Sequence, residues 1–393
     1  MGQIRPPALE NARQRHYTGE TMRILRRTLL QLPAAAWVAE AASADDPQHR
    51  IVFQEKGRFG GWPANHGMWA WANELLVGFE AGWFLANNGT GREHAIDYSH
   101  AAEHVLARSL DGGETWKLEK PGSLKAPPDT KQAGVPTEPG GRVAIASPGG
   151  FDFTKPGFAL TARMASIHTG PSRFYVTFDK GHQWQGPFIM PDFGTPGIAA
   201  RTDYLVDGKH SMTLFLTAAK SNRKEGRVLC ARTTDGAKTF QMVSWVGPEP
   251  GAEDFAIMPS SVRLSAKSIL TTIRHRKYIA AWRSDDNGAS WTMVGQPVDD
   301  TGGGNPPALL KLPDGRLVLT YGFRNPPYSI RARVSSDEGK TWSKDVMLRE
   351  DGGAWDLGYT RTVRRQDGHL VTTYYYNTAN DGERFIGATI WKP

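Results

Sequence analysis

Arginine side chains at the ends of apolar runs are the groups of this chain best suited to bind an anion. Leu270-Thr-Thr-Ile-Arg274 ends in one arginine and Leu319-Thr-Tyr-Gly-Phe-Arg324 in another. Arg331 and Arg333 lie two residues apart, so in a strand they point to the same face. A guanidinium grips a carboxylate through two parallel donors and remains charged. These arginines therefore predict carboxylate binding.

A second segment, residues 93–103, holds groups that could transfer a proton. It reads Glu93-His-Ala-Ile-Asp97-Tyr-Ser-His100-Ala-Ala-Glu103. Partial burial could tune Asp97, His100 or Glu103 towards neutral pH, where a general acid works best. The residues alone leave open which of the three would act.

The elements that position these groups are indicated by a repeated loop motif. Three strong copies are Ser109-Leu-Asp-Gly-Gly-Glu-Thr-Trp116, Ser284-Asp-Asp-Asn-Gly-Ala-Ser-Trp291 and Ser335-Ser-Asp-Glu-Gly-Lys-Thr-Trp342. Two weaker copies are Thr177-Phe-Asp-Lys-Gly-His-Gln-Trp184 and Thr233-Thr-Asp-Gly-Ala-Lys-Thr-Phe240. In this motif Asp and Ser/Thr bond the backbone of a tight turn, Gly supplies a positive φ, and the aromatic ring packs beneath it. We therefore assign its aspartates to structure and not to catalysis.

The spacing of the motif predicts the fold. The five aspartates follow one another at intervals of 51 to 68 residues, enough for four short strands each. Five such units, plus a last unit from Tyr359 to Pro393 without the motif, predict six blades of an all-β propeller. The ring would close by pairing the strand at 50–54 with the strand at 385–391.

The motif resembles the Asp-box, or BNR repeat, of the sialidase superfamily, and the resemblance covers about residues 50–393. It implies a six-bladed sialidase-like β-propeller in a single domain, 45–393. The activity implied is that of an exo-acting retaining glycoside hydrolase, an exo-α-sialidase that removes terminal sialic acid from glycoconjugates.

The same resemblance implies roles for individual residues. Tyr359, in Trp355-Asp-Leu-Gly-Tyr359, is similar to the family's nucleophile, a tyrosine used because a carboxylate would be repelled by the substrate's own carboxylate. Its activating acid would be Glu253, or Asp254 beside it, although the family spacing reaches Met258 instead. Asp97, twelve residues before Ser109, matches the position of the acid/base.

The substrate carboxylate would be held by an arginine cluster. Arg274 and Arg333 match two positions of the family's arginine triad, with Arg324 as a rival to Arg274. The family's first arginine position holds Gly61, so Arg58 or Arg201 would have to complete the cluster.

The net charge and the cysteine count limit the partners and sites that we expect. The formal net charge is +7, of which residues 1–44 carry +3, and no long basic run follows, so we expect no nucleic-acid partner. The mildly cationic body could favour an acidic glycan. Cys230 is the only cysteine, which excludes an intramolecular disulfide. The mechanism demands no cofactor, and no dense carboxylate loop predicts a Ca²⁺ site.

The N-terminus predicts export. Residues 1–44 contain Arg26-Arg27, a modestly apolar stretch and Ala42-Ser-Ala44, which resembles a twin-arginine signal peptide for a periplasmic or secreted protein. A cytoplasmic protein with an N-terminal extension is the alternative. No later stretch is apolar enough for a transmembrane helix, so we expect no stable membrane insertion.

Two other functions stay open. One is a related glycosidase acting on another acidic sugar, for instance a uronic acid; loss of the third arginine from the site would favour it. The other is a non-catalytic glycan-binding or assembly propeller, which would lack a tyrosine–carboxylate pair.

Overall fold

Short antiparallel strands joined by tight turns build nearly all of the described chain. The computed structural model describes Gly2 and residues 46–86, 93–127, 131–132, 135–137, 140–379 and 381–393. Apart from Gly2, the predicted signal peptide within residues 1–44 lies outside the described residues. No helix in these described ranges is long and apolar enough to cross a membrane.

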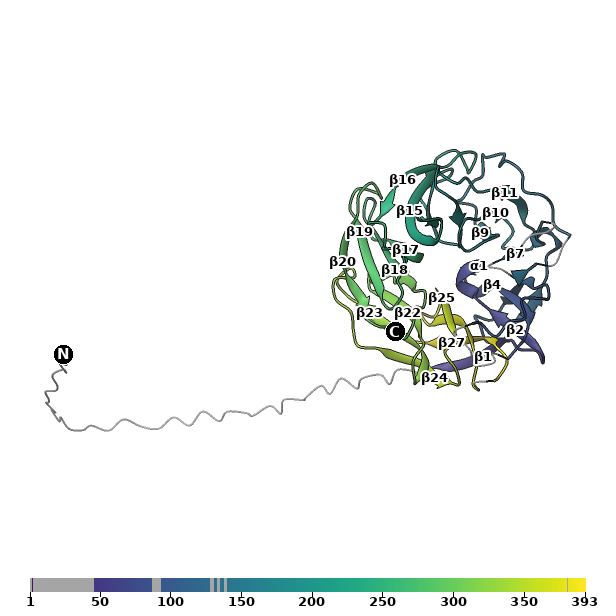
Figure 1. The fold of residues 1–393 in the computed structure, drawn as a ribbon, viewed down its shortest axis with the longest axis vertical. Coiled ribbons are helices and arrows are strands. Elements are labelled where there is room, and N and C mark those ends of the chain that lie inside the picture. Colours follow the sequence, from purple (N-terminus) through teal and green to yellow (C-terminus); the bar gives the residue numbers. More distant parts are fainter. Residues whose placement is uncertain are drawn as a thin grey trace, which may run out of the picture. The chain divides into compact units, whose positions relative to one another are not determined.

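Within the described residues, six sheets form the blades of a β-propeller, arranged as a ring in Figure 1. The first blade consists of β2 (Arg58–Gly61), β3 (Met68–Trp71), β4 (Glu74–Trp83), β5 (Glu103–Ser109) and β6 (Lys117–Glu119), with α1 (Pro63–His66) between β2 and β3. The second consists of β9 (Ala159–Met164), β10 (Ser172–Thr177) and β11 (Gln185–Ile189). The third consists of β12 (Ile198–Ala199), β13 (Tyr204–Val206), β14 (Met212–Ala219), β15 (Glu225–Thr233) and β16 (Gln241–Val246).

The other three blades have four strands each. The fourth consists of β17 (Ile257–Arg263), β18 (Ile269–Arg274), β19 (Ile279–Ser284) and β20 (Thr292–Val298). The fifth consists of β21 (Ala308–Lys311), β22 (Leu317–Phe323), β23 (Tyr328–Ser335) and β24 (Val346–Gly352). The sixth consists of β25 (Gly358–Arg364), β26 (Leu370–Tyr376), β27 (Phe385–Trp391) and β1 (Gln48–Phe53). A turn of 3₁₀ helix (Gly122–Leu124) and a ribbon of β7 (Lys131–Gln132) and β8 (Val135–Pro136) follow the first blade.

The first strand of the chain closes the ring. β1 pairs antiparallel with β27, with Gln48 opposite Ile390 and Arg50 opposite Ala388, and the two strands adjoin in Figure 1. The predicted closure and the six-bladed propeller are both confirmed.

The five Asp-boxes shape the turns between the outer strands. In the first, Asp111 accepts hydrogen bonds from Ser109 Oγ at 2.7 Å and Thr115 N at 2.9 Å, while Trp116 Nε1 donates to the Gly113 carbonyl at 3.0 Å. Burial raises the pKa of Asp111, but these hydrogen bonds outweigh it and hold the pKa at about 2. The structural assignment of this aspartate follows from its saturated hydrogen bonding.

Each box also packs against a neighbouring blade. Gly113 of the first blade lies against Val371 of the sixth, and Gly181 of the second lies against Leu76 of the first. Strands between blades are therefore covered on both faces, and all seven residues of β26 are buried. The boxes thus join blade to blade as well as strand to strand.

Candidate functional site

A pocket of about 230 Å³ lies where side chains of five blades meet. Its volume is below the roughly 300–1,000 Å³ typical of sites for drug-sized ligands, so it suits a single sugar ring. The lining residues are Trp62, Asn65, His94, Tyr98, Met164, Ile167, Arg201, Glu225, Phe255, Ile257, Arg274 and Tyr359.

Tyr359 is held in a strained conformation at the start of β25. Its φ is +53°, a left-handed value that costs a non-glycine residue of order 1–3 kcal/mol. The Asn305 side chain imposes this turn, because its Oδ1 accepts from the Tyr359 N–H at 3.0 Å and its Nδ2 donates to the Leu357 carbonyl at 2.9 Å. Gly358 beside it has φ +104°, and a Cβ there would lie 2.3 Å from Asn305. The backbone is therefore built to aim this one side chain.

The surroundings of Tyr359 favour its phenolate. Burial raises the pKa of the hydroxyl, but the positive charges of Arg274, Arg324 and Arg201 outweigh it and lower the pKa below 10. Arg274 Nη1 also donates to the hydroxyl at 3.0 Å. No carboxylate among the described residues hydrogen-bonds this hydroxyl.

Arg274, at the end of β18, is a cation without a carboxylate partner among the described residues. Its Nε is buried and makes no hydrogen bond there. The guanidinium packs 5.4 Å from the Phe255 ring centroid and 5.6 Å from that of Tyr359. A partly buried cation that lacks a carboxylate partner favours the binding of an anion. The structure places Arg274 in the pocket, as the sequence analysis predicted.

A histidine–aspartate pair stands beside Tyr359. His94 Nδ1 lies 2.6 Å from Asp356 Oδ1, and the His94 ring centroid is 6.5 Å from that of Tyr359. Asp356 is fully buried and also bonds the Ala95 N–H, the Tyr375 hydroxyl and Arg384 Nε. Burial raises its pKa, but His94 and Arg384 outweigh it and hold the pKa of Asp356 far below its usual range. His94 is therefore oriented by an ionised carboxylate, and its Nε2 has no bonded partner in the described ranges.

Arg201 lines the pocket as one of the predicted alternatives, but its charge is balanced. Its Nη1 lies 2.6 Å from Glu225 Oε1, and its Nε donates to Asn65 Oδ1 at 3.1 Å. Both side chains of the ion pair are largely buried. This pair supplies polar groups to the pocket without adding net charge.

Arg324 supports the site from behind. Its Nε and Nη2 donate to the Leu357 carbonyl, its Nη1 to the Gly304 carbonyl at 3.0 Å, and its Nη2 to the Tyr375 hydroxyl at 2.7 Å. Its guanidinium lies 5.5 Å from the Tyr359 ring centroid. Because its guanidinium nitrogens already donate to these acceptors, Arg324 affects Tyr359 through its charge and does not line the pocket.

Two predicted substrate-binding arginines lie elsewhere. Arg58 in β2 donates to the Gly82 carbonyl at 2.8 Å and packs over Trp83. Arg333, on the third strand of its blade, donates to Asp345 at 2.6 Å and to the Pro297 carbonyl at 2.7 Å. Placing either in the pocket was wrong, because Arg58 binds the neighbouring strand of its own sheet, and Arg333 binds Asp345 and the Pro297 carbonyl of β20 in the next blade. Arg274 and Arg201 are the predicted arginines that line the pocket.

Two predicted catalytic acids also lie outside the pocket. Asp97 accepts from Ser99 N at 2.8 Å and Ser99 Oγ at 2.6 Å and lies 2.7 Å from His100 Nδ1; these bonds lower its pKa, the opposite of what an acid donor needs. The third rival, Glu103, pairs with Lys120 at another pocket.

Glu253 points to solvent, with 84% of its side chain exposed, 3.7 Å from Lys224. The cause is Lys220, whose buried Nζ binds the carbonyls of Gly251, Ala252 and Asp254 and fixes the loop with the Glu253 side chain outward.

Sequence reasoning missed His94 and Glu225, which line the pocket, and Asp356, which binds His94. His94 is the second residue of the acid-bearing segment, and Asp356 stands three residues before Tyr359, so both lie in segments that the sequence marked. Their pairing across 262 residues had no local signal.

Comparison with known proteins supports the architecture. The family model described as the BNR repeat-like domain matches residues 178–372. No curated protein sequence matches the chain significantly.

Several solved structures share the fold at low identity. A protein of unknown function from Dyadobacter fermentans is 18% identical with a TM-score of 0.64, over 88% of this chain and 99% of that one. The NanB sialidase from Streptococcus pneumoniae is 12% identical with a TM-score of 0.52, over 88% of this chain and 70% of that one. The GH93 α-L-arabinofuranosidase of Fusarium graminearum, solved with arabinobiose, is 14% identical with a TM-score of 0.54, over 88% of this chain and 97% of that one.

Proposed function

We propose that this six-bladed propeller with five Asp-boxes belongs to the sialidase superfamily and is an exo-acting glycoside hydrolase for an acidic sugar. The observation that carries the proposal is the contact between Tyr359 and Arg274: a tyrosine with a lowered pKa beside an unpaired guanidinium, in a pocket sized for one ring. A sialidase and an α-L-arabinofuranosidase among the similar propellers support glycoside hydrolysis as the reaction.

In this proposal Arg274 holds the carboxylate of the substrate and Tyr359 attacks the anomeric carbon. The phenol oxygen forms a bond to that carbon, and the glycosidic oxygen leaves with a proton from His94 Nε2. Water, deprotonated by His94, then releases the sugar and restores the tyrosine. Asp356 keeps His94 in the tautomer and orientation that both steps need.

The arginine arrangement favours a uronic acid over sialic acid. A clamp of three arginines would need two free guanidinium groups in addition to that of Arg274. Arg201, however, is paired with Glu225, and Arg324 donates to the Leu357 and Gly304 carbonyls and to the Tyr375 hydroxyl. Arg333 donates to Asp345 and Arg58 donates to the Gly82 carbonyl, both outside the pocket. Both sugars carry one carboxylate, so the preference rests on the clamp: in the described residues the pocket lacks the three-arginine cluster that the resemblance implies for sialic acid, which makes a hexuronic acid the first choice and sialic acid the second.

The test is turnover of three fluorogenic substrates by the full chain: a glucuronide, an α-ketoside of N-acetylneuraminic acid, and a neutral α-L-arabinofuranoside. We expect release from an acidic substrate, and a loss of about 100-fold or more in kcat for Tyr359→Phe. Tyr328→Phe, in β23 away from the pocket, is the matched control and should keep full activity. Preference for the neutral arabinoside would overturn the assignment of the carboxylate to Arg274.

A non-catalytic glycan-binding propeller is the second candidate. It is favoured by the observation that no described carboxylate bonds the Tyr359 hydroxyl, which lacks the partner of a tyrosine–carboxylate pair. Calorimetric binding of an acidic monosaccharide, abolished by Arg274→Met and without turnover of any of the three substrates, would select this function.

A further inference from the structure

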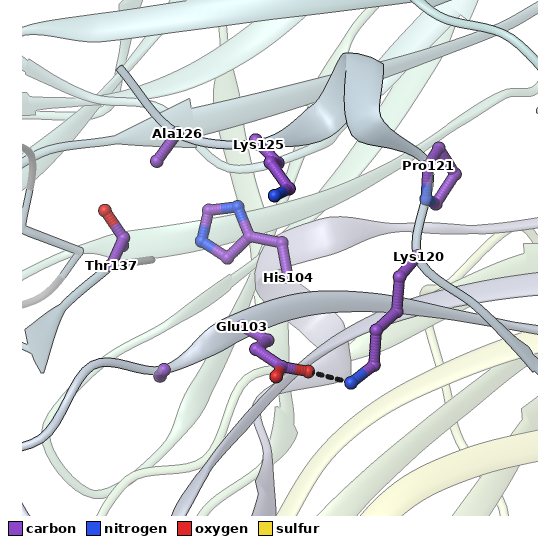
Figure 2. Close-up of a pocket in the computed structure, with 8 residues that line it drawn as sticks. Glu103, His104, Lys120, Pro121, Lys125, Ala126 and Thr137 are labelled. Atoms are coloured by element: carbon purple, nitrogen blue, oxygen red, sulfur yellow. Dashed lines mark ion pairs between the residues drawn. The ribbon is translucent and has the colours of Figure 1, made fainter. Parts of the chain in front are cut away.

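A second polar pocket lies outside the Tyr359 site, between the first blade and the segment that follows it (Figure 2). Its volume is about 300 Å³, and its polar lining comes from Glu103, His104, Lys120, Lys125 and Thr137. Glu103 and Lys120 form an ion pair, drawn as a dashed line in Figure 2. Lys125 has no ion-pair partner in the part of the chain that the structure describes.

Behind His104 lies an interblade cluster formed by Glu80, His104, His66, Arg163 and Arg173. Glu80 of β4 stands opposite His104 of β5, Arg163 of β9 stands opposite Arg173 of β10, and the two histidine rings are 5.3 Å apart. Both ring nitrogens of each histidine, both Glu80 oxygens and three arginine nitrogens are buried and have no hydrogen-bond partner among the residues that the structure describes. Buried polar atoms are normally hydrogen-bonded, so this many without a partner indicate a place for water or another bound group.

The charges of the interblade cluster do not balance. Arg163 and Arg173 have no ion pair within the described ranges, and burial lowers the pKa of Arg163 to about 9, leaving it charged at neutral pH. Burial raises the pKa of Glu80 to about 8, against the pull of both arginines, so this carboxyl is mostly protonated there. Water can satisfy hydrogen bonds, but it cannot neutralise two buried guanidinium groups.

The pocket is physically joined to the interblade cluster. His104 belongs to both, with its ring nitrogens buried. On the other side, Arg173 Nε donates to the Tyr175 hydroxyl at 3.1 Å, and that hydroxyl donates to the Lys125 carbonyl at 3.5 Å. An anion in the pocket would therefore contact Lys125 and His104 directly, and Lys125 is linked through Tyr175 to Arg173.

We propose that this pocket binds a small oxyanion, a carboxylate or phosphate, held by Lys125 and His104 with its charge balanced by Arg163 and Arg173. The site is separate from the Tyr359 pocket and shares no lining residue with it. The proposal holds whether or not the chain hydrolyses glycosides, since it rests on a different set of residues.

The experiment is isothermal titration of the full chain with inorganic phosphate and with acetate, each against sodium chloride at equal ionic strength. We expect saturable binding of at least one oxyanion, weakened about ten- to hundredfold by Lys125→Met, which removes one charge-assisted hydrogen bond. The matched control is Lys267→Met, an exposed lysine far along the chain, which should leave the affinity unchanged. His104→Gln, checked for folding by its melting temperature, should also weaken binding.

The relative affinity of the two probes separates a phosphate site from a carboxylate site. The proposal is overturned if neither oxyanion binds saturably up to about 50 mM, far above the affinity of even a weak site. It is equally overturned if binding persists undiminished in Lys125→Met, since the anion would then lie elsewhere.

Discussion

Replacing Asp356 by asparagine should destabilise the fold by about 3–5 kcal/mol at neutral pH. The carboxylate is fully buried and accepts from the Tyr375 hydroxyl, the Ala95 N–H and Arg384 Nε, besides its contact with His94. Asparagine keeps the shape but removes the charge, so the Arg384 guanidinium, 2% exposed, loses its counter-ion. Loss of one partner of a buried ion pair accounts for the magnitude.

The assay is urea unfolding of both proteins across pH. Because the folded-state pKa of Asp356 lies below its ordinary value of 3.8, its ionised form stabilises the fold fully above that value and progressively less as pH falls below it. The difference between wild type and Asp356→Asn should therefore be greatest at pH 7 and shrink below about pH 4. Asp351→Asn is the control: its partner is Arg349 and its side chain is 57% exposed, so it should cost at most about 1 kcal/mol. A loss below about 1 kcal/mol for Asp356→Asn at pH 7 would refute the reasoning.

Two further outcomes follow from the same geometry. If Tyr359 acts as a phenolate, the pH profile of kcat/KM should rise with an inflection below pH 10, and Arg274→Met should move that inflection upward, because the charge that lowers the pKa is lost; an unmoved inflection would assign the titration to another group. In the third Asp-box, Ala237 takes the place that glycine holds in the others, with φ +66°, so Ala237→Gly should stabilise the fold by about 0.5–1 kcal/mol in urea unfolding, with Gly339→Ala as the reciprocal, destabilising change.

The fold could be predicted because its signal is local. Each Asp-box specifies its turn within eight consecutive residues, and the spacing of the five boxes, with the last unit that lacks one, predicts six blades without knowledge of any long-range contact. The pairing of β1 with β27 also followed, since a ring leaves the first and last strands no other partners.

The site could be predicted only in part. Tyr359 and Arg274 lie at ends of strands, where the fold alone decides that they face the pocket. Glu253 and Arg333 have suitable positions in the chain, but their orientation is decided by distant partners, Lys220 for the loop that holds Glu253 and Asp345 for Arg333. Such side-chain pairings have no periodicity that a single sequence could display.

The closure of the ring has a consequence for how the protein comes into being. β1 ends at Phe53, whereas its partner β27 begins only at Phe385, so this contact can form only after the strands of all the other blades have been synthesised. The same late blade carries Asp356 and Tyr359. A chain that lacks this blade therefore has an open seam in the ring and at the same time lacks Tyr359 of the proposed site.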